Sequence, residues 1–217
     1  LTELQQAGKI DKVSGTNFDS DHVLALVTAG VPLASLQLQY SLLDRRPEKR
    51  MVSLGAEHGF ALFCYGTVAG GFLSDKWLGM AEPSHPLENR SLTKYKLIID
   101  DIGGWDLFQT LLATLRRIAD RHDTDIATIA SAAMLRKAGV AAVIVGARNR
   151  DHLPSNLAIS DIVLSAQDLS DIEAVQAEAK ELEGDVYTLE RDRTGRHGSI
   201  MKYNLNKGPD GGPNTGE

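Results

Sequence analysis

Cysteine is almost absent from this sequence, in which Cys64 is the single one among 217 residues. A lone thiol excludes an intramolecular disulfide and suits a reducing compartment. Long apolar runs are also lacking, since no stretch approaches the roughly 18 to 20 residues that a membrane-spanning helix needs. The amphipathic opening, LTELQQAGKIDK, does not have the layout of a signal peptide. We therefore expect a cytoplasmic protein, and because the sequence starts at Leu1 rather than at methionine we treat it as a candidate fragment.

Positive charge is in short supply, with 23 lysines and arginines against 29 aspartates and glutamates and a net charge of -6. This balance predicts no general attraction to nucleic acid or to an anionic membrane, so any bound anion must be held by local geometry. The six histidines do not have the spacing of metal ligands, and we predict no metal site. The hydrophobic share of 42% is that of an ordinary globular protein, and the length suits one domain.

Strand-like and helix-like segments alternate along the chain. Strands are predicted for residues 12–16, 33–40, 60–65 and 140–146, and helices for residues 1–7, 19–30, 46–59, 105–123, 124–139, 149–159 and 165–184. Strands joined by helices predict an α/β fold with a parallel sheet and right-handed crossovers. Four such units make either an open doubly wound sheet or a partial TIM barrel, because a complete (β/α)8 barrel needs about 250 residues.

Two stretches interrupt this alternation. Residues 78–104 carry Pro83, Pro86 and many charges, and we interpret them as a loop that is long enough to be functional. Residues 184–217 form a polar C-terminal tail that ends in KGPDGGPNTGE, a composition that cannot bury enough apolar surface to order itself. We expect one domain over residues 1–183 and disorder at the end of the tail.

Polar side chains follow the first two predicted strands. In parallel α/β folds, ligands bind where strands end and helices begin. Thr16 and Asn17 follow the first strand, where their side chains can either cap the next helix or reach a ligand. Gln37 and Gln39 share one face of the second strand. A buried amide needs a partner, so one of these glutamines is expected to meet either a polar ligand or a backbone group.

The third strand runs into the segment FCYGTVAGGFLSDK, residues 63–76. Glycines such as Gly66 and Gly70 allow backbone N–H groups to approach an anion. Lys76 can add a positive charge, and Tyr65 offers a flat face for an aromatic ring. Together these features suit a nucleotide. Taken singly, a tyrosine at a strand end is more often part of the core, and a surface lysine is usually solvated.

The fourth strand is followed by two arginines, Arg148 and Arg150, at a predicted helix start. Cations at this position oppose the helix dipole, which is tolerable when a phosphate binds beside them. Two solvated arginines are the alternative interpretation. The end of the fourth strand is therefore a second candidate anion site.

Four segments, GKIDKVSGTNF, LQLQYSLLDRRPE, FCYGTVAGGFLSDKWLG and AAVIVGARNRDHLPSN, resemble in order and spacing the C-terminal half of the aldo-keto reductases. Members of that family are NADP(H)-dependent (β/α)8 barrels that reduce aldehydes and ketones. The resemblance covers residues 1–183. It implies that the fold is the second half of such a barrel and that the cofactor is NADP(H).

The resemblance also implies the roles of individual residues. Thr16, Asn17 and Gln37 match residues that hydrogen-bond the nicotinamide carboxamide, and Tyr65 matches the aromatic residue that stacks on the nicotinamide ring. The implied contacts of the diphosphate are Gly66, Val68, Gly70 and Lys76, within or beside the turn that ends at Gly71, and those of the adenosine 2′-phosphate and adenine are Gly146, Ala147, Arg148, His152 and Asn156.

The sequence departs from the family pattern at a few positions. Thr16 stands where serine is common, Gly66 and Thr67 where serine and proline are frequent, and His152 where glutamine or arginine is frequent. The change at His152 leaves both NADP and NAD open as cofactors. The family's catalytic aspartate, tyrosine, lysine and histidine lie on the first four strands of the barrel, and no residues of this sequence match them.

We therefore expect the NADP(H)-binding part of an aldo-keto reductase-like oxidoreductase, which would act on a small-molecule carbonyl substrate once catalytic residues are supplied. One alternative is a non-catalytic module that binds a nicotinamide cofactor or another protein. Another is a phosphate-binding enzyme of different chemistry on a barrel-derived fold. Half a barrel has two open sheet edges, so self-association is also expected. Neither nucleic acid nor a membrane is an expected partner.

Overall fold

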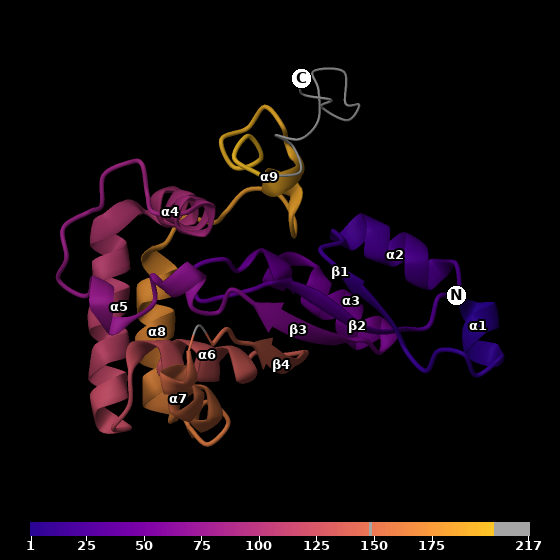
Figure 1. Cartoon of the computed structure of the whole chain (residues 1–217), viewed down its shortest axis with the longest axis horizontal. Coiled ribbons are helices and arrows are strands. Elements are labelled where there is room, and N and C mark those ends of the chain that lie inside the picture. The colour runs from indigo at the N-terminus through magenta and orange to yellow at the C-terminus, as the bar shows by residue number, and fades with distance from the viewer. Residues whose placement is uncertain (148, 202–217) are drawn as a thin grey trace.

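The computed structural model describes residues 1–147 and 149–201, which contain a four-stranded parallel sheet. Its strands are β1 (Val13–Thr16), β2 (Leu33–Gln39), β3 (Ala61–Tyr65) and β4 (Val140–Ile144), in the spatial order β1-β2-β3-β4 (Figure 1). A doubly wound sheet reverses its strand order part-way, whereas a (β/α)8 barrel adds each strand beside the preceding one. The sheet is therefore a partial barrel, and the predicted α/β fold with parallel strands is confirmed.

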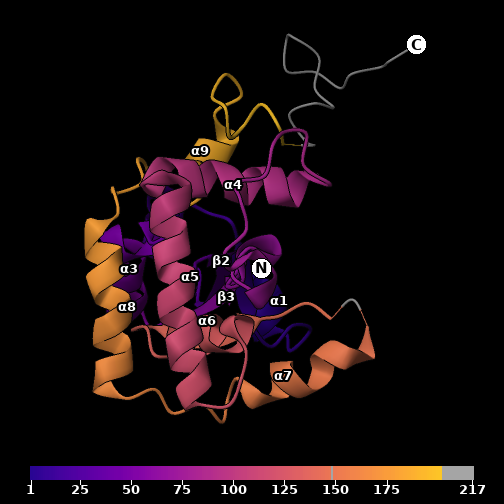
Figure 2. The same cartoon turned by 90° about the vertical axis from the view of Figure 1, so that its left-hand side faces the viewer.

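Helices connect the strands and cover one face of the sheet. The α-helices are α1 (Thr2–Gln6), α2 (Ser20–Thr28), α3 (Met51–His58), α4 (Arg90–Ile102), α5 (Gly104–Arg121), α6 (Ile126–Leu135), α7 (Leu153–Ala158), α8 (Ala166–Glu178) and α9 (Thr188–Arg191). Short 3-10 helices are η1 (Arg46–Lys49), η2 (Ala69–Gly71), η3 (Asp75–Trp77) and η4 (Arg150–His152). Figure 2 shows α5 and α8 side by side, with α4 crossing the end of α5. Within the described ranges, no helix is both long and apolar enough to cross a membrane.

Capping residues set several of the helix ends. The side chain of Asp19 accepts a hydrogen bond from the N–H of His22 at 3.0 Å and so caps α2. Asp125 caps α6 in the same way, at 2.7 Å from the N–H of Thr128. Gly59 ends α3 with a φ of 74°, in the left-handed region where glycine pays no steric penalty. These local signals fix where the helices start and stop.

The core lies between the helices and one face of the sheet. Leu36 of β2 and Leu62 of β3 are fully buried in it. Because side chains alternate along a strand, Gln37, Phe63 and Tyr65 point to the opposite face, which corresponds to the interior of a barrel. Alternation thus separates an apolar outer face from an inner face that carries the predicted ligand contacts.

The predicted loop over residues 78–104 is wrong for its second half, which forms α4. Asn89 caps this helix by accepting a hydrogen bond from the N–H of Leu92 at 3.0 Å. Leu92, Tyr95, Ile99 and Ile102 recur at helical spacing and are buried. The prolines that favour a loop precede this helix, and charged residues lie along it. Its apolar stripe packs into the core.

The fourth strand is only partly covered, although its continuous apolar run is typical of a parallel strand that is buried on both faces. Ala141 is exposed, and the side chains of Ile144 and Val145 keep 40% and 38% of their accessible surface. On the neighbouring strand, Phe63 keeps 37%. In the described sheet β4 pairs with β3 alone, and Phe63 and Ile144 on the inner face stay partly exposed. The apolar run is therefore half-covered, because the barrel is not closed around it.

The first part of the polar tail is folded onto the domain. Residues 184–201 include α9, and within them Val186 and Glu190 are buried. Both figures place α9 on the side of the molecule opposite α7, near α4. The predicted disorder concerns residues 207–217, which lie outside the described residues.

Candidate functional site

Thr16 and Gln37 are direct neighbours in the register of β1 and β2, so two predicted ligand contacts lie side by side. Asn17 follows, and its backbone N–H donates to the carbonyl of Gln37 at 3.0 Å. The φ of Asn17 is 57°, a left-handed conformation that asparagine adopts more readily than most residues. The side-chain amide of the half-buried Gln37 makes no hydrogen bond to the described residues. The end of β2 thus offers a free amide next to a threonine hydroxyl.

Tyr65 connects the end of β3 with the end of β1. Its hydroxyl donates to Oδ1 of Asn17 at 2.7 Å, although β2 lies between the two strands. Burial, with the nearby Tyr187 and Tyr95 adding to it, raises the pKa of the Tyr65 hydroxyl above its ordinary value of 10.0. The hydroxyl therefore remains a neutral hydrogen-bond donor at ordinary pH. Asn17, Gln37 and Tyr65 meet at one edge of the sheet, as the sequence predicts.

Gln39, the second glutamine of β2, joins a buried charged cluster rather than a ligand or a backbone group. Its Nε2 donates to Oδ2 of Asp44 at 2.6 Å. Arg46 pairs with Asp44 at 2.7 Å and with Glu190 of the tail at 2.8 Å, and all three charged side chains are buried. Burial alone raises the pKa of Asp44, but Arg46 outweighs it and holds that pKa below 3.8. The cluster is structural, and it fixes the tail to the loop after β2.

The glycine turn after β3 packs against α4. A Cβ on Gly66 would lie 2.2 Å from the hydroxyl oxygen of Tyr95, and a Cβ on Gly70 would lie 2.8 Å from a ring carbon of the same residue. Both glycines also have positive φ, 74° and 66°. Packing against Tyr95 is therefore sufficient to explain these two glycines. Gly71 differs, because its Cβ position faces open space.

Val68 and Lys76 lie in the same segment as this turn. The carbonyl of Val68 accepts backbone hydrogen bonds from Gly71 at 2.9 Å and from Leu73 at 3.1 Å, which holds the turn closed. Lys76 is exposed in η3, with its ammonium 5.3 Å from the centre of the Trp77 ring. It forms no ion pair with the described residues. Its charge is therefore available to an anion.

The residues after β4 form a second group at the same edge of the sheet. Asn156 of α7 donates from Nδ2 to the carbonyl of Gly146 at 3.2 Å, which ties the helix to the strand end. Ala147 and His152 are exposed. Arg148 lies outside the described residues. The structure thus brings Gly146 and Asn156 together, as expected for one binding surface.

Lys94 of α4 is a feature of this site that the sequence did not predict. Its ammonium lies 5.7, 5.4 and 5.6 Å from the ring centres of Tyr65, Tyr95 and Tyr187. It makes no hydrogen bond or ion pair with the part of the chain that the structure describes. Burial lowers the pKa of Lys94, while Glu190 acts in the opposite direction. No local pattern signals this cage, since its three tyrosines come from β3, α4 and the tail.

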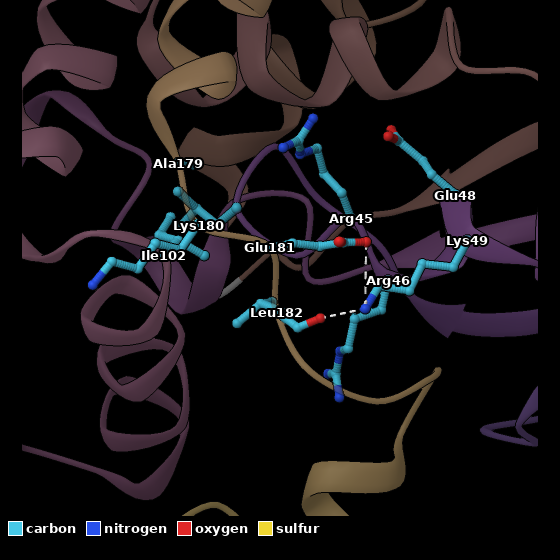
Figure 3. Close-up of a pocket in the computed structure, with 10 residues that line it drawn as sticks. Arg45, Arg46, Glu48, Lys49, Ile102, Ala179, Lys180, Glu181 and Leu182 are labelled. Carbon is cyan, nitrogen blue, oxygen red and sulfur yellow. Dashed lines mark hydrogen bonds and ion pairs between the residues drawn. The ribbon is translucent and has the colours of Figure 1, made fainter.

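A cavity of about 350 Å³ lies elsewhere, between η1, the end of α4 and the segment after α8. Its polar lining includes Arg45, Lys49 and Lys180, and Figure 3 shows Lys49 directed to the carbonyl of Leu182 and the carboxylate of Glu181. None of the predicted cofactor contacts within the described residues lines this cavity. The part of the chain that the structure describes contains no cluster of side chains that would hold a metal ion. The candidate site is therefore the edge formed by the ends of β1, β2 and β3.

Comparison with known families agrees with this geometry. The family model for the aldo/keto reductases matches residues 1–177. The chain belongs to the aldo/keto reductase family.

The curated relatives are longer proteins, and this chain matches only part of each. Protein tas of Escherichia coli is 30% identical over 183 residues, which are 81% of this chain and 50% of that protein. The NADH-specific methylglyoxal reductase of Escherichia coli is 26% identical over 168 residues, with 77% and 49% covered. Flagellar radial spoke protein 5 of Chlamydomonas reinhardtii is 31% identical over 125 residues, with 56% and 24% covered. The chain thus spans half or less of the curated relatives it matches.

Solved aldo-keto reductase structures share the fold over a similar span. A thermostable aldo-keto reductase in complex with the inhibitor epalrestat superposes with a TM-score of 0.58 at 23% identity, over 80% of this chain and 52% of that one. The glycerol dehydrogenase of Gluconobacter oxydans superposes with a TM-score of 0.69 at 17% identity, over 84% and 54%. The four parallel strands correspond to a partial aldo-keto reductase barrel.

Proposed function

We propose that this chain is the C-terminal half of an aldo-keto reductase barrel and that it binds NADP(H). The observation that carries the proposal is the convergence of Thr16, Asn17, Gln37 and Tyr65 at one edge of three neighbouring strands. Aldo-keto reductases use a nicotinamide cofactor, which supplies a hydride to a carbonyl group when bound. Ligands of parallel barrels sit at the carboxyl ends of the strands, where these four residues lie.

The chemistry of these residues fits the nicotinamide end of the cofactor. The free amide of Gln37 and the hydroxyl of Thr16 supply donors and acceptors that complement a carboxamide. Tyr65 supplies an aromatic ring with its hydroxyl already engaged by Asn17, so its face is held in a fixed orientation. Lys76 and the open side of Gly71 suit the diphosphate. Gly146, His152 and Asn156 remain proposed contacts for the adenosine end.

Carbonyl reduction by this protein requires an acid from outside the described site. A general acid works best when its pKa lies near the operating pH. Burial raises the pKa of both Tyr65 and Tyr95, which makes their hydroxyls weaker acids than ordinary tyrosines. We propose that the proton donor comes from another part of the protein or another chain, and that a small aldehyde or ketone is reduced only when that part is present.

A role as a protein-interaction module is a second candidate, favoured by a different observation. Phe63 and Ile144 leave apolar surface on the uncovered inner face of the sheet. One relative is named flagellar radial spoke protein 5. Turnover of NADPH with an aldehyde, in the presence of the missing barrel half, separates the enzymatic role from this one.

Calorimetric titration of the folded chain with NADPH tests the cofactor proposal. We expect saturable binding in the wild type and weaker binding in Lys76→Ala. Loss of one charged contact costs on the order of 1.5 to 3 kcal/mol, or about tenfold to hundredfold in affinity. Lys9→Ala, which removes an exposed lysine between α1 and β1, is the matched control and should bind as the wild type does. Equal losses in both lysine variants would reject a specific role for Lys76.

A further inference from the structure

A short segment of the C-terminal tail, residues 185–191, crosses the edge at which β1 ends, and we call it the strap (Figure 1). Arg191 at the end of the strap donates to the backbone carbonyl of Asn17 at 2.5 Å and pairs with Asp19 at 2.7 Å. At the beginning of the strap, the carboxylate of Asp185 accepts from the N–H of Ser20 at 2.7 Å. Both ends of the strap are therefore fastened to the turn between β1 and α2.

The strap is also anchored, next to its C-terminal end, by a buried ion pair. Glu190 pairs with Arg46 through two hydrogen bonds, at 2.8 and 3.1 Å, and the side chains of both residues are at most 1% exposed. Arg46 also pairs with Asp44 at 2.7 Å. When the strap lifts, Arg46 keeps this second carboxylate, so opening the strap does not leave its charge unpaired.

The strap also reaches the aromatic ring at the end of β3. The ammonium of Lys94 lies 5.6 Å from the ring centre of Tyr187 and 5.7 Å from that of Tyr65. Lys94 therefore occupies the space between the strap and Tyr65. Burial lowers the pKa of the Lys94 ammonium, and Glu190 acts in the opposite direction.

We propose that the docked strap and NADP(H) compete for the edge formed by the ends of β1 and β3. This inference rests on the proposed function. The strap contacts Asn17, and Lys94 lies between the strap and Tyr65. Asn17 and Tyr65 are also the proposed contacts of the nicotinamide. The strap and the cofactor cannot occupy this edge at the same time, so binding of either one lowers the apparent affinity of the other. The tail of this chain thus acts as an intramolecular inhibitor of cofactor binding.

Two features make the strap suitable for reversible release. Tyr187 has a φ of 61°, a left-handed conformation that is strained in a residue with an aromatic side chain and that relaxes when the strap lifts. Arg191 keeps 38% of its side-chain surface exposed, so its ion pair with Asp19 is screened by water and salt. The strap is held by buried contacts, which include Glu190 and Val186, and by the partly exposed ion pair of Arg191 with Asp19.

Limited trypsin digestion of the full chain, with and without saturating NADPH, tests the competition. Trypsin cleaves after arginine and lysine, and Arg191 lies within the strap. We expect NADPH to accelerate cleavage after Arg191 several-fold, measured by mass spectrometry. Cleavage after Lys12, which precedes β1 and lies outside the strap, serves as the internal control and should not change.

The fluorescence of bound NADPH, recorded in the same samples, separates the two proposals. If NADPH binds and cleavage after Arg191 slows, the strap closes over the cofactor. If NADPH binds and cleavage stays constant, the strap does not respond to the cofactor. Either result rejects the competition. If NADPH does not bind the folded chain, the proposed function itself fails, and the competition fails with it.

A second variant provides an independent measurement. Glu190→Gln weakens the anchor while keeping the shape of the side chain, and Arg46 retains Asp44. We expect faster cleavage after Arg191 without cofactor, together with at least threefold tighter NADPH binding. Glu178→Gln, an exposed position at the end of α8, is the matched control. Faster cleavage with unchanged affinity would overturn the proposal.

Discussion

The hydroxyl of Tyr65 donates a hydrogen bond to the side chain of Asn17 over 2.7 Å, which joins the first and third strands of the sheet across the strand between them. The bond orients the tyrosine ring and fixes the amide of Asn17 at the same edge. It makes the candidate site a connected unit rather than a set of separate strand ends.

Tyr65→Phe separates the role of this hydroxyl from that of the ring. Removal of the hydroxyl should lower the free energy of unfolding by about 0.5 to 1.5 kcal/mol, because Asn17 loses a hydrogen-bond donor. NADPH affinity should change by less than about threefold, since the aromatic face remains. Urea denaturation and fluorescence titration measure the two effects. A variant of unchanged stability that no longer binds would show that the hydroxyl, and not the ring, contacts the cofactor.

Arg148→Ala tests the choice between the two nicotinamide cofactors. An arginine recognises a phosphate through charge-assisted hydrogen bonds, so loss of Arg148 should weaken NADPH more than NADH, by about tenfold. Arg136→Ala, at an exposed arginine directly after α6, is the control. Equal losses for NADPH and NADH would mean that Arg148 does not read the 2′-phosphate.

The open edges of the sheet predict self-association. In the described sheet β1 and β4 each pair with one strand only. Phe63 of β3 and Ile144 of β4 expose apolar surface on the inner face. Unpaired strand edges beside apolar surface favour association between copies. Light scattering after size exclusion, at tens of micromolar, should show dimers or larger species, and Ile144→Lys should shift them towards monomer. A wild type that is monomeric with a sharp thermal transition would contradict this expectation.

Asp168 predicts part of the pH dependence of stability. Burial raises the pKa of its carboxyl, but hydrogen bonds from His122, Arg121 and Ser165 outweigh that effect and hold the pKa below 3.8. A depressed pKa stabilises the fold above the unfolded value, about 3.9, and that contribution is lost as the pH falls through the folded value. Asp168→Asn should therefore cost about 1.5 to 3 kcal/mol at pH 7.

The pH profile of this variant supplies the check. The difference in unfolding free energy between wild type and Asp168→Asn should shrink below pH 4, as measured by urea denaturation. Asp161→Asn, at an exposed position, should behave as the wild type does at both pH values. A difference that stays constant from pH 7 to pH 3 would mean that the carboxylate charge of Asp168 does not stabilise the fold.

The features that the sequence predicted are those encoded locally. Caps such as Asp19 and Asp125 and the turn at Gly59 are read from a few adjacent residues, and they placed most helices correctly. Gln37 and Tyr65 were found because side chains alternate along a strand and ligand sites follow strand ends. Local pattern and topology together place these two side chains at one edge of the sheet.

The features that the sequence did not predict depend on contacts between distant segments. The apolar stripe of α4 was hidden because prolines precede it and charged residues line its exposed face. The pair of Arg46 with Glu190 joins residues 144 positions apart, and no spacing rule anticipates it. The sequence predicts that Gly66 is open to an anion, yet Tyr95 fills the space beside it. Tertiary packing, rather than propensity, decides these cases.

Hydrogen–deuterium exchange with and without NADPH tests the central claim most directly, because it reports where the cofactor binds as well as whether it binds. We predict slower exchange in peptides that cover residues 13–17, 33–39 and 61–71, at the ends of β1, β2 and β3, and unchanged exchange around the cavity lined by Arg45 and Lys49. Absence of protection at these strand ends, or protection confined to that cavity, would contradict a nicotinamide site at this edge of the sheet.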